Sequence, residues 1–373
     1  MHITSRRRLV ASGSAAALAL VLALTACSSS GSEPDDAAST PASEPSLEFT
    51  GPNGEIPGTL DELSLSDDEL AEVAEGSYTA AFVWHTSSEF VSAVEKGATA
   101  QFDELGIDVV ASTQADFDAA TQANNLQTVL ALDPDIIVAI AVDPTSAAQA
   151  FQEAVDAGTK LVIMTTPPAG YEAGNQFVSI VTESLTEAGR ANAEILGDAL
   201  GGEGDVGYLY YDADFWFTNQ RDEAFKSWLA YEYPDMEIVA EEGFADEAST
   251  EEVAAALIAR NPSITGIYVS WATAAQGVVA ALRDLGRSDI KVVTNDLDAT
   301  LASDMARDGN VIGMVGNGSL DIGKGLALAG AYGILDKEAP ALIASPPTKV
   351  TKDNLVEGWE DDYGTEPPAG VTE

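Results

Sequence analysis

The chain has 373 residues, of which 61 are Asp or Glu and 17 are Lys or Arg, so its formal net charge is −44. Such a charge excludes electrostatic binding to nucleic acid or to an anionic membrane surface. The hydrophobic fraction of 46% is normal for a folded protein, and the length is sufficient for two domains with complete cores.

Residues 1–26 have the layout of a secretory signal peptide. Residues 6–8 are all Arg and precede an apolar run at 15–24, which is too short to span a bilayer as a helix. The basic segment also resembles a twin-arginine export signal, so the general secretory route and the twin-arginine route both stay open. Removal of residues 1–26 takes away three Arg and no acidic residue, which changes the formal charge from −44 to −47.

Cys27 is the only cysteine in the chain and follows Leu24-Thr25-Ala26. This run resembles the lipobox of bacterial lipoproteins, in which a leucine and two small or hydroxylated residues precede the cysteine that receives diacylglycerol. A lone cysteine cannot form an intramolecular disulfide, and an exported protein gains nothing from a buried free thiol. We therefore expect lipidation at Cys27 and anchoring to the membrane. The alternative is an ordinary secretory signal followed by an incidental cysteine.

Residues 27–60 are expected to be a disordered tether. The Ser-, Pro- and acid-rich stretches at 28–36 and 41–45 contain too few apolar residues to order themselves. The segment Ser66-Asp67-Asp68-Glu69 then fits a helix capping box. Residues 61–76 are therefore expected to form a short helical lead-in to the main body.

From Tyr78 onward, apolar runs alternate with longer segments of helical periodicity. Strands of a first series are predicted at 78–84, 107–112, 135–141, 160–165 and 177–181. Strands of a second series are predicted at 206–211, 237–241, 265–270, 291–294 and 311–315. The runs are continuous rather than alternating, as is typical of parallel strands that are covered on both faces.

This alternation predicts an α/β fold of two doubly wound, Rossmann-like lobes with parallel sheets. The boundary between the two series lies near residues 182–184. Open parallel sheets bind ligands beyond the carboxyl ends of their strands. Two such lobes therefore predict a ligand site in the cleft between them.

Several local patterns from about Tyr78 to Val350 resemble a known family. They are Phe90-Val91 at the start of a helix that ends in Phe102-Asp103-Glu104-Leu105-Gly106, Asp133-Pro134-Asp135-Ile136-Ile137-Val138 leading into Asp143-Pro144-Thr145-Ser146-Ala147, Asn219-Gln220-Arg221-Asp222-Glu223-Ala224-Phe225, and Val292-Val293-Thr294-Asn295-Asp296. In this order and spacing they resemble the type I periplasmic binding proteins of ABC importers, specifically the ribose/galactose-binding-like branch.

The resemblance implies two lobes joined by three crossover strands, which close on the ligand by a hinge motion. It places lobe 1 at 77–182 plus 318–343 and lobe 2 at 183–317 plus 344–373. Together with the lipobox, it implies a lipoprotein on the extracellular face of the cytoplasmic membrane of a Gram-positive bacterium. The expected partners are a small-molecule ligand, an ABC permease and the membrane, and the protein is expected to be a monomer.

The ligand contacts that we expect come from both lobes. They are Trp84, Ser88, Phe90, Asp143, Thr165, Trp216, Asn219, Arg221, Trp271, Asp296 and Asn317. Asp296 matches a ligand-binding Asp of the family, and Phe90 matches an aromatic that stacks on the ligand. Three of these residues have a structural alternative: Phe90 as a core residue, Asp143 as a helix N-cap, and Arg221 as an exposed helix residue.

Aromatic residues add to this set. Phe215, Trp216 and Phe217 are consecutive at a predicted strand-to-helix loop, where neighbouring side chains point apart, so we expect at least one to face the cleft and choose Trp216. Trp271 follows a predicted strand and suggests stacking on an apolar face of the ligand. His85, one of two histidines, is expected to line the cleft at most.

The chain also departs from the sugar-binding relatives that it resembles. Thr165 and Thr166 stand where those proteins commonly carry an Asp-Arg pair, Asn219 stands where many carry an Arg, and Trp271 stands where they often carry Asn. The polar clamp for a free hexose or pentose is therefore incomplete. This pattern predicts a smaller, less hydroxylated or more apolar ligand, such as a sugar derivative, a polyol, an inositol-like ring or a furanone-type signal.

Enzyme motifs are missing from the sequence: a Gly-x-Gly-x-x-Gly after a strand, a phosphate loop, a metal-spaced His/Cys set and a Gly-x-Ser-x-Gly. We therefore expect no enzymatic activity, catalytic residue, metal or cofactor. The export signal and the acidity exclude an intracellular DNA-binding regulator with the same lobes. The alternative function is a sensory accessory lipoprotein, or a receptor for a non-sugar ligand such as a cyclic signal or a nucleoside. A permease and an ATPase encoded nearby would favour transport, and a histidine kinase alone would favour sensing.

Overall fold

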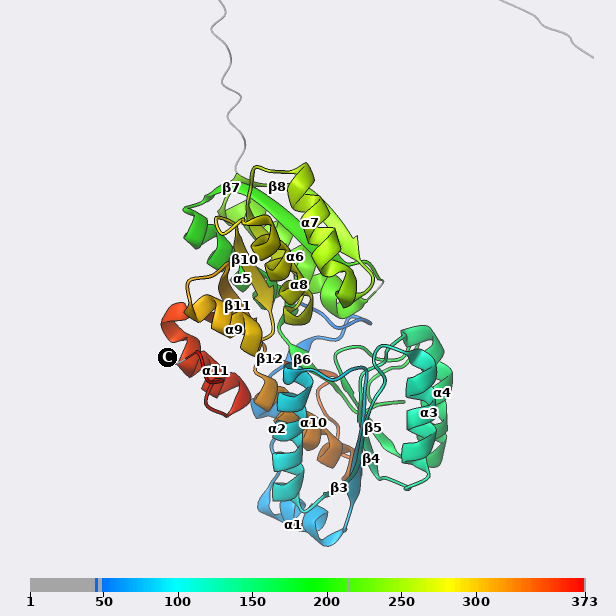
Figure 1. Cartoon of the computed structure of the whole chain (residues 1–373). Helices are drawn as coiled ribbons and strands as arrows, with labels where there is room; N and C mark the ends of the chain where they lie inside the picture. Colours follow the sequence, from blue (N-terminus) through cyan, green and yellow to red (C-terminus); the bar gives the residue numbers. More distant parts are fainter. Residues whose placement is uncertain (1–43, 46–48, 214, 372–373) are drawn as a thin grey trace, which may run out of the picture. The chain divides into compact units, whose positions relative to one another are not determined.

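The computed structural model describes residues 44–45, 49–213 and 215–371. The predicted signal peptide, Cys27 and most of the predicted tether lie outside these residues. The described residues form two α/β lobes, each with a central sheet that helices cover on both faces (Figure 1). Across the same residues, we find no helix whose length and apolar character would suit it to span a membrane.

The first lobe is built on a parallel sheet with the strand order β1-β12-β6-β5-β4-β2-β3. Its strands are β1 (Pro57–Gly58), β2 (Thr79–Trp84), β3 (Asp108–Gln114), β4 (Ile136–Ala139), β5 (Lys160–Met164), β6 (Ile180–Glu183) and β12 (Leu342–Ser345). The inner strands β2, β4, β5 and β6 are buried almost throughout. This burial on both faces explains their continuous apolar sequences.

Two pairs of helices cover this sheet. Helices α2 (Glu89–Leu105) and α10 (Ser319–Ile334) pack on one face, and α3 (Ala119–Leu130) and α4 (Pro144–Ala157) pack on the other (Figure 1). Helices α2 and α10 approach closely at a glycine, because a Cβ at Gly323 would lie 2.1 Å from the carbonyl oxygen of Val94. This contact joins an early helix to a late one in the same lobe.

The second lobe has the strand order β13-β11-β10-β9-β7-β8. Its strands are β7 (Glu203–Tyr211), β8 (Asp235–Phe244), β9 (Ile264–Val269), β10 (Lys291–Asn295), β11 (Val311–Gly316) and β13 (Thr348–Thr351). Strand β13 pairs antiparallel with β11, so this sheet is mixed, whereas a parallel sheet was predicted. Only two residues separate β12 from β13, so the chain leaves the first sheet at the carboxyl end of β12 and enters the second sheet at once, in the direction opposite to β11.

The helices of the second lobe also form two layers. Helices α5 (Leu185–Leu200) and α6 (Trp216–Glu232) pack on one face, and α7 (Thr250–Arg260), α8 (Ala272–Leu285) and α9 (Ala299–Ala306) pack on the other. The remaining helical segments are η1 (Leu60–Glu62), α1 (Asp67–Glu75), η2 (Glu247–Ser249), η3 (Lys352–Asn354) and α11 (Leu355–Tyr363). Helix α11 contributes Trp359 and Tyr363 to the core that lies under α7, α8 and α9.

In the described chain, the backbone passes between the sheets after β6, after β11 and between β12 and β13. Hydrogen bonds connect these crossings: Ser184 N donates to the carbonyl of Ser345 (2.9 Å), and Ser345 Oγ donates to the carbonyl of Asn317 (2.7 Å). The predicted division assigns Glu183 and residues 344–345 to lobe 2. They lie in the first sheet instead, because Ala344 and Ser345 continue the pairing of β12 with β6 up to Glu183.

The structure contains a strand for each predicted strand, with small differences in their ends. Strand β6 begins at Ile180 rather than Phe177, because Phe177 lies in a loop although its ring is buried. Strands β1, β12 and β13 were not predicted. They have two to four residues each, which is too few for a periodic pattern to be recognised.

The tether was predicted to extend to residue 60, but the structure has an ordered strand, β1, before that residue. Strand β1 pairs with β12, with Pro57 opposite Leu342 and Gly58 opposite Ile343. Leu342 and Ile343 are buried, so β1 covers an edge that would otherwise present unpaired backbone groups. The capping box at the start of α1 is confirmed, because Ser66 and Glu69 exchange the two expected hydrogen bonds.

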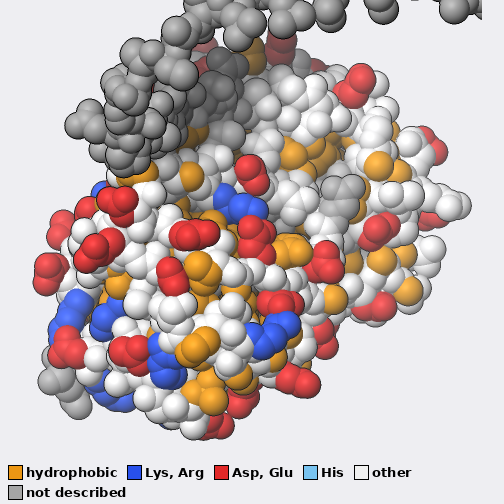
Figure 2. Space-filling model, turned by 90° about the horizontal axis from the view of Figure 1, so that it is seen from above, with side chains coloured by type: hydrophobic (Ala, Val, Ile, Leu, Met, Phe, Trp, Pro, Cys, Tyr) orange, Lys and Arg blue, Asp and Glu red, His pale blue; other side chains and the backbone are white. Residues whose placement is uncertain are grey.

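Acidic side chains are spread over the face of the molecule shown in Figure 2, and Lys and Arg are fewer there. The described surface thus follows the acidic composition of the whole sequence. An acidic surface of this kind is well solvated and does not indicate a particular partner.

Candidate ligand-binding site

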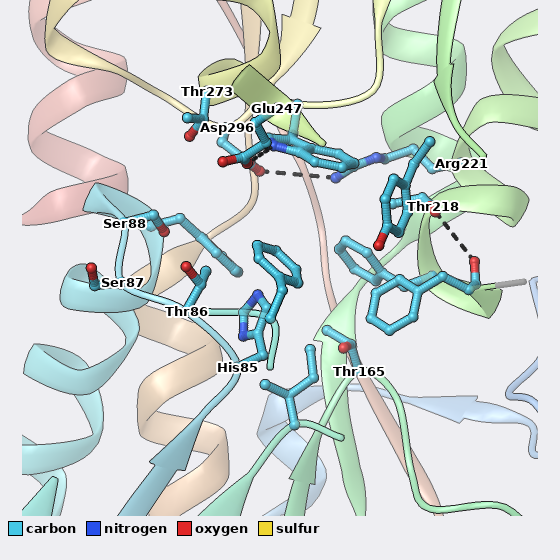
Figure 3. Close-up of a pocket in the computed structure, with 17 residues that line it drawn as sticks. His85, Thr86, Ser87, Ser88, Thr165, Thr218, Arg221, Glu247, Thr273 and Asp296 are labelled. Carbon is cyan, nitrogen blue, oxygen red and sulfur yellow. Dashed lines mark hydrogen bonds and ion pairs between the residues drawn. The ribbon is translucent and has the colours of Figure 1, made fainter. Parts of the chain in front are cut away.

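A pocket lies between the two lobes, at the carboxyl ends of their strands (Figure 3). The first lobe lines it with residues that follow β2, β3, β4 and β5, and the second lobe with residues that follow β7, β8, β9 and β10. The lining residues are His85, Thr86, Ser87, Ser88, Phe90, Phe117, Ile140, Thr165, Tyr211, Phe215, Phe217, Thr218, Arg221, Glu247, Trp271, Thr273 and Asp296. Ligands of open α/β sheets bind in this position.

Six of the residues expected to contact ligand line this pocket. They are Ser88, Phe90, Thr165, Arg221, Trp271 and Asp296. They lie far apart in the sequence and on both lobes, yet the fold places them around one space. That they contact a ligand stays a prediction.

Arg221 lies on α6 and has only 1% of its side chain exposed. Its Nη1 donates to Glu183 Oε1 (2.8 Å), and its Nη2 donates to the carbonyl of Ser270 (2.6 Å). The guanidinium also lies 4.8 Å from the centroid of the Phe217 ring. Burial raises the pKa of Glu183 to about 7, although Arg221 favours its charged form. The exposed-helix alternative for Arg221 is therefore wrong, because its positive charge is buried against a carboxylate.

Asp296 directly follows β10 and has 19% of its side chain exposed. Its Oδ1 accepts a hydrogen bond from Asn317 Nδ2 (2.6 Å) and lies 3.9 Å from Arg221 Nη1. Burial raises the pKa of Asp296. Asn317 is fully buried and is not among the lining residues, so it orients Asp296 from behind the pocket wall.

Trp271 directly precedes α8 and lines the pocket. Its Nε1 donates to a carboxylate oxygen of Glu247, and its ring meets the edges of Tyr211 and Phe244 at centroid distances of 5.2 and 4.9 Å. Burial raises the pKa of Glu247, and the negative charge of Asp296 raises it further. The indole is therefore held in place before any ligand arrives.

Half of the residues with which the first lobe lines the pocket carry hydroxyl groups. Thr86, Ser87, Ser88 and Thr165 lie on its side of the space in Figure 3. Ser88 is also the N-cap of α2, and its Oγ accepts a hydrogen bond from Val91 N (3.1 Å). Small hydroxyl side chains at this wall can exchange hydrogen bonds with a hydroxylated ligand.

Two expected contacts from the first lobe are not at the pocket. Trp84 is 2% exposed and stacks on Phe82 in the core, and its Nε1 donates to Glu95 Oε2 (2.6 Å). It faces the core because it is still inside β2, two residues after Phe82, so both side chains point to the face of the sheet that α2 and α10 cover. Asp143 is the N-cap of α4 and accepts a hydrogen bond from Ser146 N (2.7 Å). The alternative interpretation of Asp143 as a helix N-cap is therefore confirmed.

The choice of Trp216 as the aromatic that faces the cleft is wrong, because Phe215 and Phe217 line the pocket instead. Helix α6 begins at Trp216, so helical spacing rather than strand alternation decides the directions of these side chains. Phe217 and Arg221 are four residues apart and share the pocket face. Trp216 lies on another face, where its ring stacks against Phe49 (6.2 Å), and Asn219 is exposed and does not line the pocket.

Sequence reasoning missed several lining residues, including Phe117, Ile140, Tyr211 and Glu247. Ile140 directly follows β4, and the other three lie at the end of a strand or within three residues of it. The position of a residue just past a predicted parallel strand was therefore the signal that could have found them. In the described part of the chain, we find no group of three or more His, Cys, Asp or Glu that could hold a metal ion.

The model of the periplasmic binding protein domain matches residues 80–337, which is more than half of the chain. The chain belongs to this family. The two lobes and the pocket between them are the architecture that the sequence resemblance implied for a type I binding protein. A comparison with curated proteins found no match.

Solved structures confirm the fold of this periplasmic binding protein. An ABC transporter solute-binding protein from Agrobacterium vitis, bound with α-D-tagatopyranose, has a TM-score of 0.70 at 23% identity over 77% of this chain and 99% of its own. One from Mycobacterium smegmatis with bound glycerol has a TM-score of 0.66 at 21% identity over 75% and 96%. One from Bacillus halodurans with bound myo-inositol has a TM-score of 0.64 at 18% identity over 77% and 99%.

The buried ion pair should make Arg221 essential for stability. We predict that Arg221→Met lowers the free energy of unfolding by about 3–5 kcal/mol, because Glu183 would stay buried without its partner. The double variant Glu183→Gln with Arg221→Met should be more stable than Arg221→Met alone. Urea denaturation measures both. A change of less than about 1 kcal/mol in Arg221→Met would contradict the importance of the pair.

His85 should make stability depend on pH. Burial lowers its pKa from 6.5 to about 4, so the unfolded chain binds the proton more tightly than the folded one. The free energy of unfolding should therefore fall by up to about 3 kcal/mol between pH 6.5 and pH 4, with no contribution from His85 above pH 7. Urea denaturation of the wild type and of His85→Gln at each pH isolates this contribution. Parallel pH profiles for the two proteins would refute it.

Proposed function

We propose that this chain is the substrate receptor of an ABC importer, anchored outside the cell by a lipid on Cys27, and that it captures a sugar or sugar-like molecule and delivers it to a permease. The observation that carries the proposal is the convergence of aromatic, hydroxyl and charged side chains from both lobes on one pocket. Concave sites with apolar walls and a few convergent polar groups are typical of small-molecule binding.

The chemistry of the walls supports a ring-shaped, hydroxylated ligand. Rings such as those of Phe90 and Trp271 can stack on the C–H face of a sugar or cyclitol. The carboxylates of Asp296 and Glu247 can accept hydrogen bonds from hydroxyl groups in the plane of such a ring. Thr165, Thr86 and Ser88 offer further hydroxyl partners on the opposite wall.

The solved relatives support the same class of ligand. Tagatose, myo-inositol and glycerol, which are named in those structures, are all small polyols or sugars. With at most 23% identity, these relatives support a ligand class for this chain and not a particular compound. Delivery to a permease and lipid anchoring are supported by the family and by the signal segment before Cys27.

A thermal-shift panel of sugars, polyols, nucleosides and cyclic signals tests the ligand class. We expect at least one sugar derivative or polyol to raise the melting temperature, because a ligand at 100 times its Kd stabilises the native state by about 2.7 kcal/mol. Trp271→Ala should abolish the shift, whereas Trp271→Phe, which keeps a stacking ring, should retain part of it. Stabilisation by nucleosides or cyclic signals alone would contradict a sugar-like ligand. Stabilisation by free aldoses alone would contradict the prediction that the polar contacts for a free hexose or pentose are incomplete.

Replacement of Cys27 tests the anchor. In its host, the wild-type chain should sediment with membranes, and Cys27→Ser should be released into the medium, because one residue carries the acyl chains. Mass spectrometry of the N-terminal peptide of the wild type should show a lipid-modified cysteine. Equal membrane association of both proteins would show that Cys27 is not the anchor.

A further inference from the structure

With Glu247 and Asp296 ionised, the net charge of the pocket is negative whether Glu183 is protonated or not. Among the described residues, Arg221 is the only Lys or Arg that lines the pocket, whereas Glu247 and Asp296 supply two carboxylates. Glu183 lies behind Arg221 and can only make the balance more negative when it is ionised. A ligand therefore meets a field that attracts cations and repels anions.

Arg221 has little capacity left for an anionic ligand. Its two terminal nitrogens already donate to Glu183 and to the carbonyl of Ser270, and its flat face lies over Phe217. Its Nε has no partner among the described residues, but it is buried as well. The side chain is only 1% exposed and its charge is paired with that of Glu183, so it offers little to a carboxylate or phosphate, which would need both charge and a bidentate contact.

The two carboxylates lack a full cationic partner in the pocket. The Asp296 carboxylate is 3.9 Å from Arg221 Nη1, and no ion pair is formed by Glu247 within the described chain. Glu247 accepts a hydrogen bond from Trp271, and Asp296 accepts one from Asn317, so both are held in fixed positions. Figure 3 shows Glu247, Asp296 and Thr273 on the same side of the space.

The pocket also continues outward into a second hollow with the same charge. The two share Thr86, Phe117, Tyr211, Glu247 and Trp271. The outer hollow adds the carboxylates of Asp116 and Asp246, and none of its described lining residues is basic. A cation is therefore attracted along the whole path from the rim to the inner site.

Six of the residues that line the pocket are Phe, Tyr or Trp. The lining rings are Phe90, Phe117, Tyr211, Phe215, Phe217 and Trp271. Ring faces carry negative electrostatic potential and attract ammonium groups, and this attraction is strongest for Trp. Aromatic faces beside carboxylates are a suitable environment for a protonated amine, while the same faces also stack on a sugar ring.

We infer that the ligand is a polyhydroxylated ring that carries a protonated amine, such as an amino sugar or an aminocyclitol, with its ammonium group near Glu247 and Asp296. This inference rests on the proposed function and narrows it from sugar-like molecules in general to cationic ones. It assigns to Glu247 the role of discriminating between the amine and the neutral ring. Sugar acids and sugar phosphates are excluded by the same field.

Calorimetric titration with matched neutral and amine rings tests the inference. The probes are D-glucose and D-glucosamine, D-galactose and D-galactosamine, and myo-inositol and an amino-deoxy-inositol, with D-glucuronate as the anion. In at least one pair the amine should bind about tenfold tighter than its neutral partner, because an ammonium group gains both ion-pair and cation–π contacts. Glucuronate should not bind.

Two variants identify the residue responsible. Glu247→Gln keeps an oxygen that can accept the Trp271 hydrogen bond but removes the charge, so the ratio of amine to neutral affinity should fall about fivefold or more. Glu237→Gln removes a charge from an exposed position on β8, outside both hollows, and should leave the ratio unchanged. A ratio that is unchanged in Glu247→Gln overturns the role assigned to Glu247.

The outcomes separate this inference from the proposed function. If the neutral member of each binding pair binds as tightly as the amine, the inference is overturned and the proposed function stands. If no member of any pair binds, the proposed function is overturned as well.

Discussion

The buried ion pair between Arg221 and Glu183 fixes the pocket relative to the crossing between the two sheets. Glu183 is the last residue of β6, after which the chain leaves the first sheet, and Arg221 lies on α6 of the second lobe. Both side chains are buried, so neither charge can be left without the other. The pair therefore ties the helix that presents Phe217, Thr218 and Arg221 to the backbone about which the lobes are joined.

A layer of buried polar side chains continues from this pair beneath the pocket. Asp222, the neighbour of Arg221, accepts hydrogen bonds from Tyr268 and from Ser270 Oγ, both at 2.6 Å. Asn295 donates to Tyr268 Oη and to the carbonyl of Ser270, and it accepts a hydrogen bond from Asn192. These contacts cross-link α5, α6, β9 and β10 at the carboxyl ends of the strands. Because these hydrogen bonds form together in only one geometry, they hold the floor of the site in place without a ligand.

The site and the crossings also share residues. Asn317 orients Asp296 at the pocket, and its own carbonyl accepts a hydrogen bond from Ser345 at the next crossing. Ser345 in turn accepts a hydrogen bond from the backbone of Ser184. A ligand that engages Asp296 thus acts on a side chain that is one hydrogen bond away from the segments through which the lobes are connected. The pocket residue Asp296 is thus linked by hydrogen bonds to two of the crossings between the sheets.

The sequence by itself determined the strand series, the alternation of strands and helices, and the edge of the sheets at which a ligand site must lie, because burial on both faces leaves a continuous apolar pattern in each parallel strand. It also pointed to Arg221 and Asp296, since motif spacing preserves their positions relative to those strands. Only the tertiary structure decided that Trp84 faces the core, that Phe217 rather than Trp216 faces the pocket, and that Glu247 lies beside Trp271. A shift of one residue at the start of a helix rotates a side chain by about 100°, and contacts between residues distant in the chain leave no local pattern. For the same reason, the sequence did not predict β1, β12 and β13 or the ordered end of the tether. Each of these strands pairs with a strand that lies far away in the sequence.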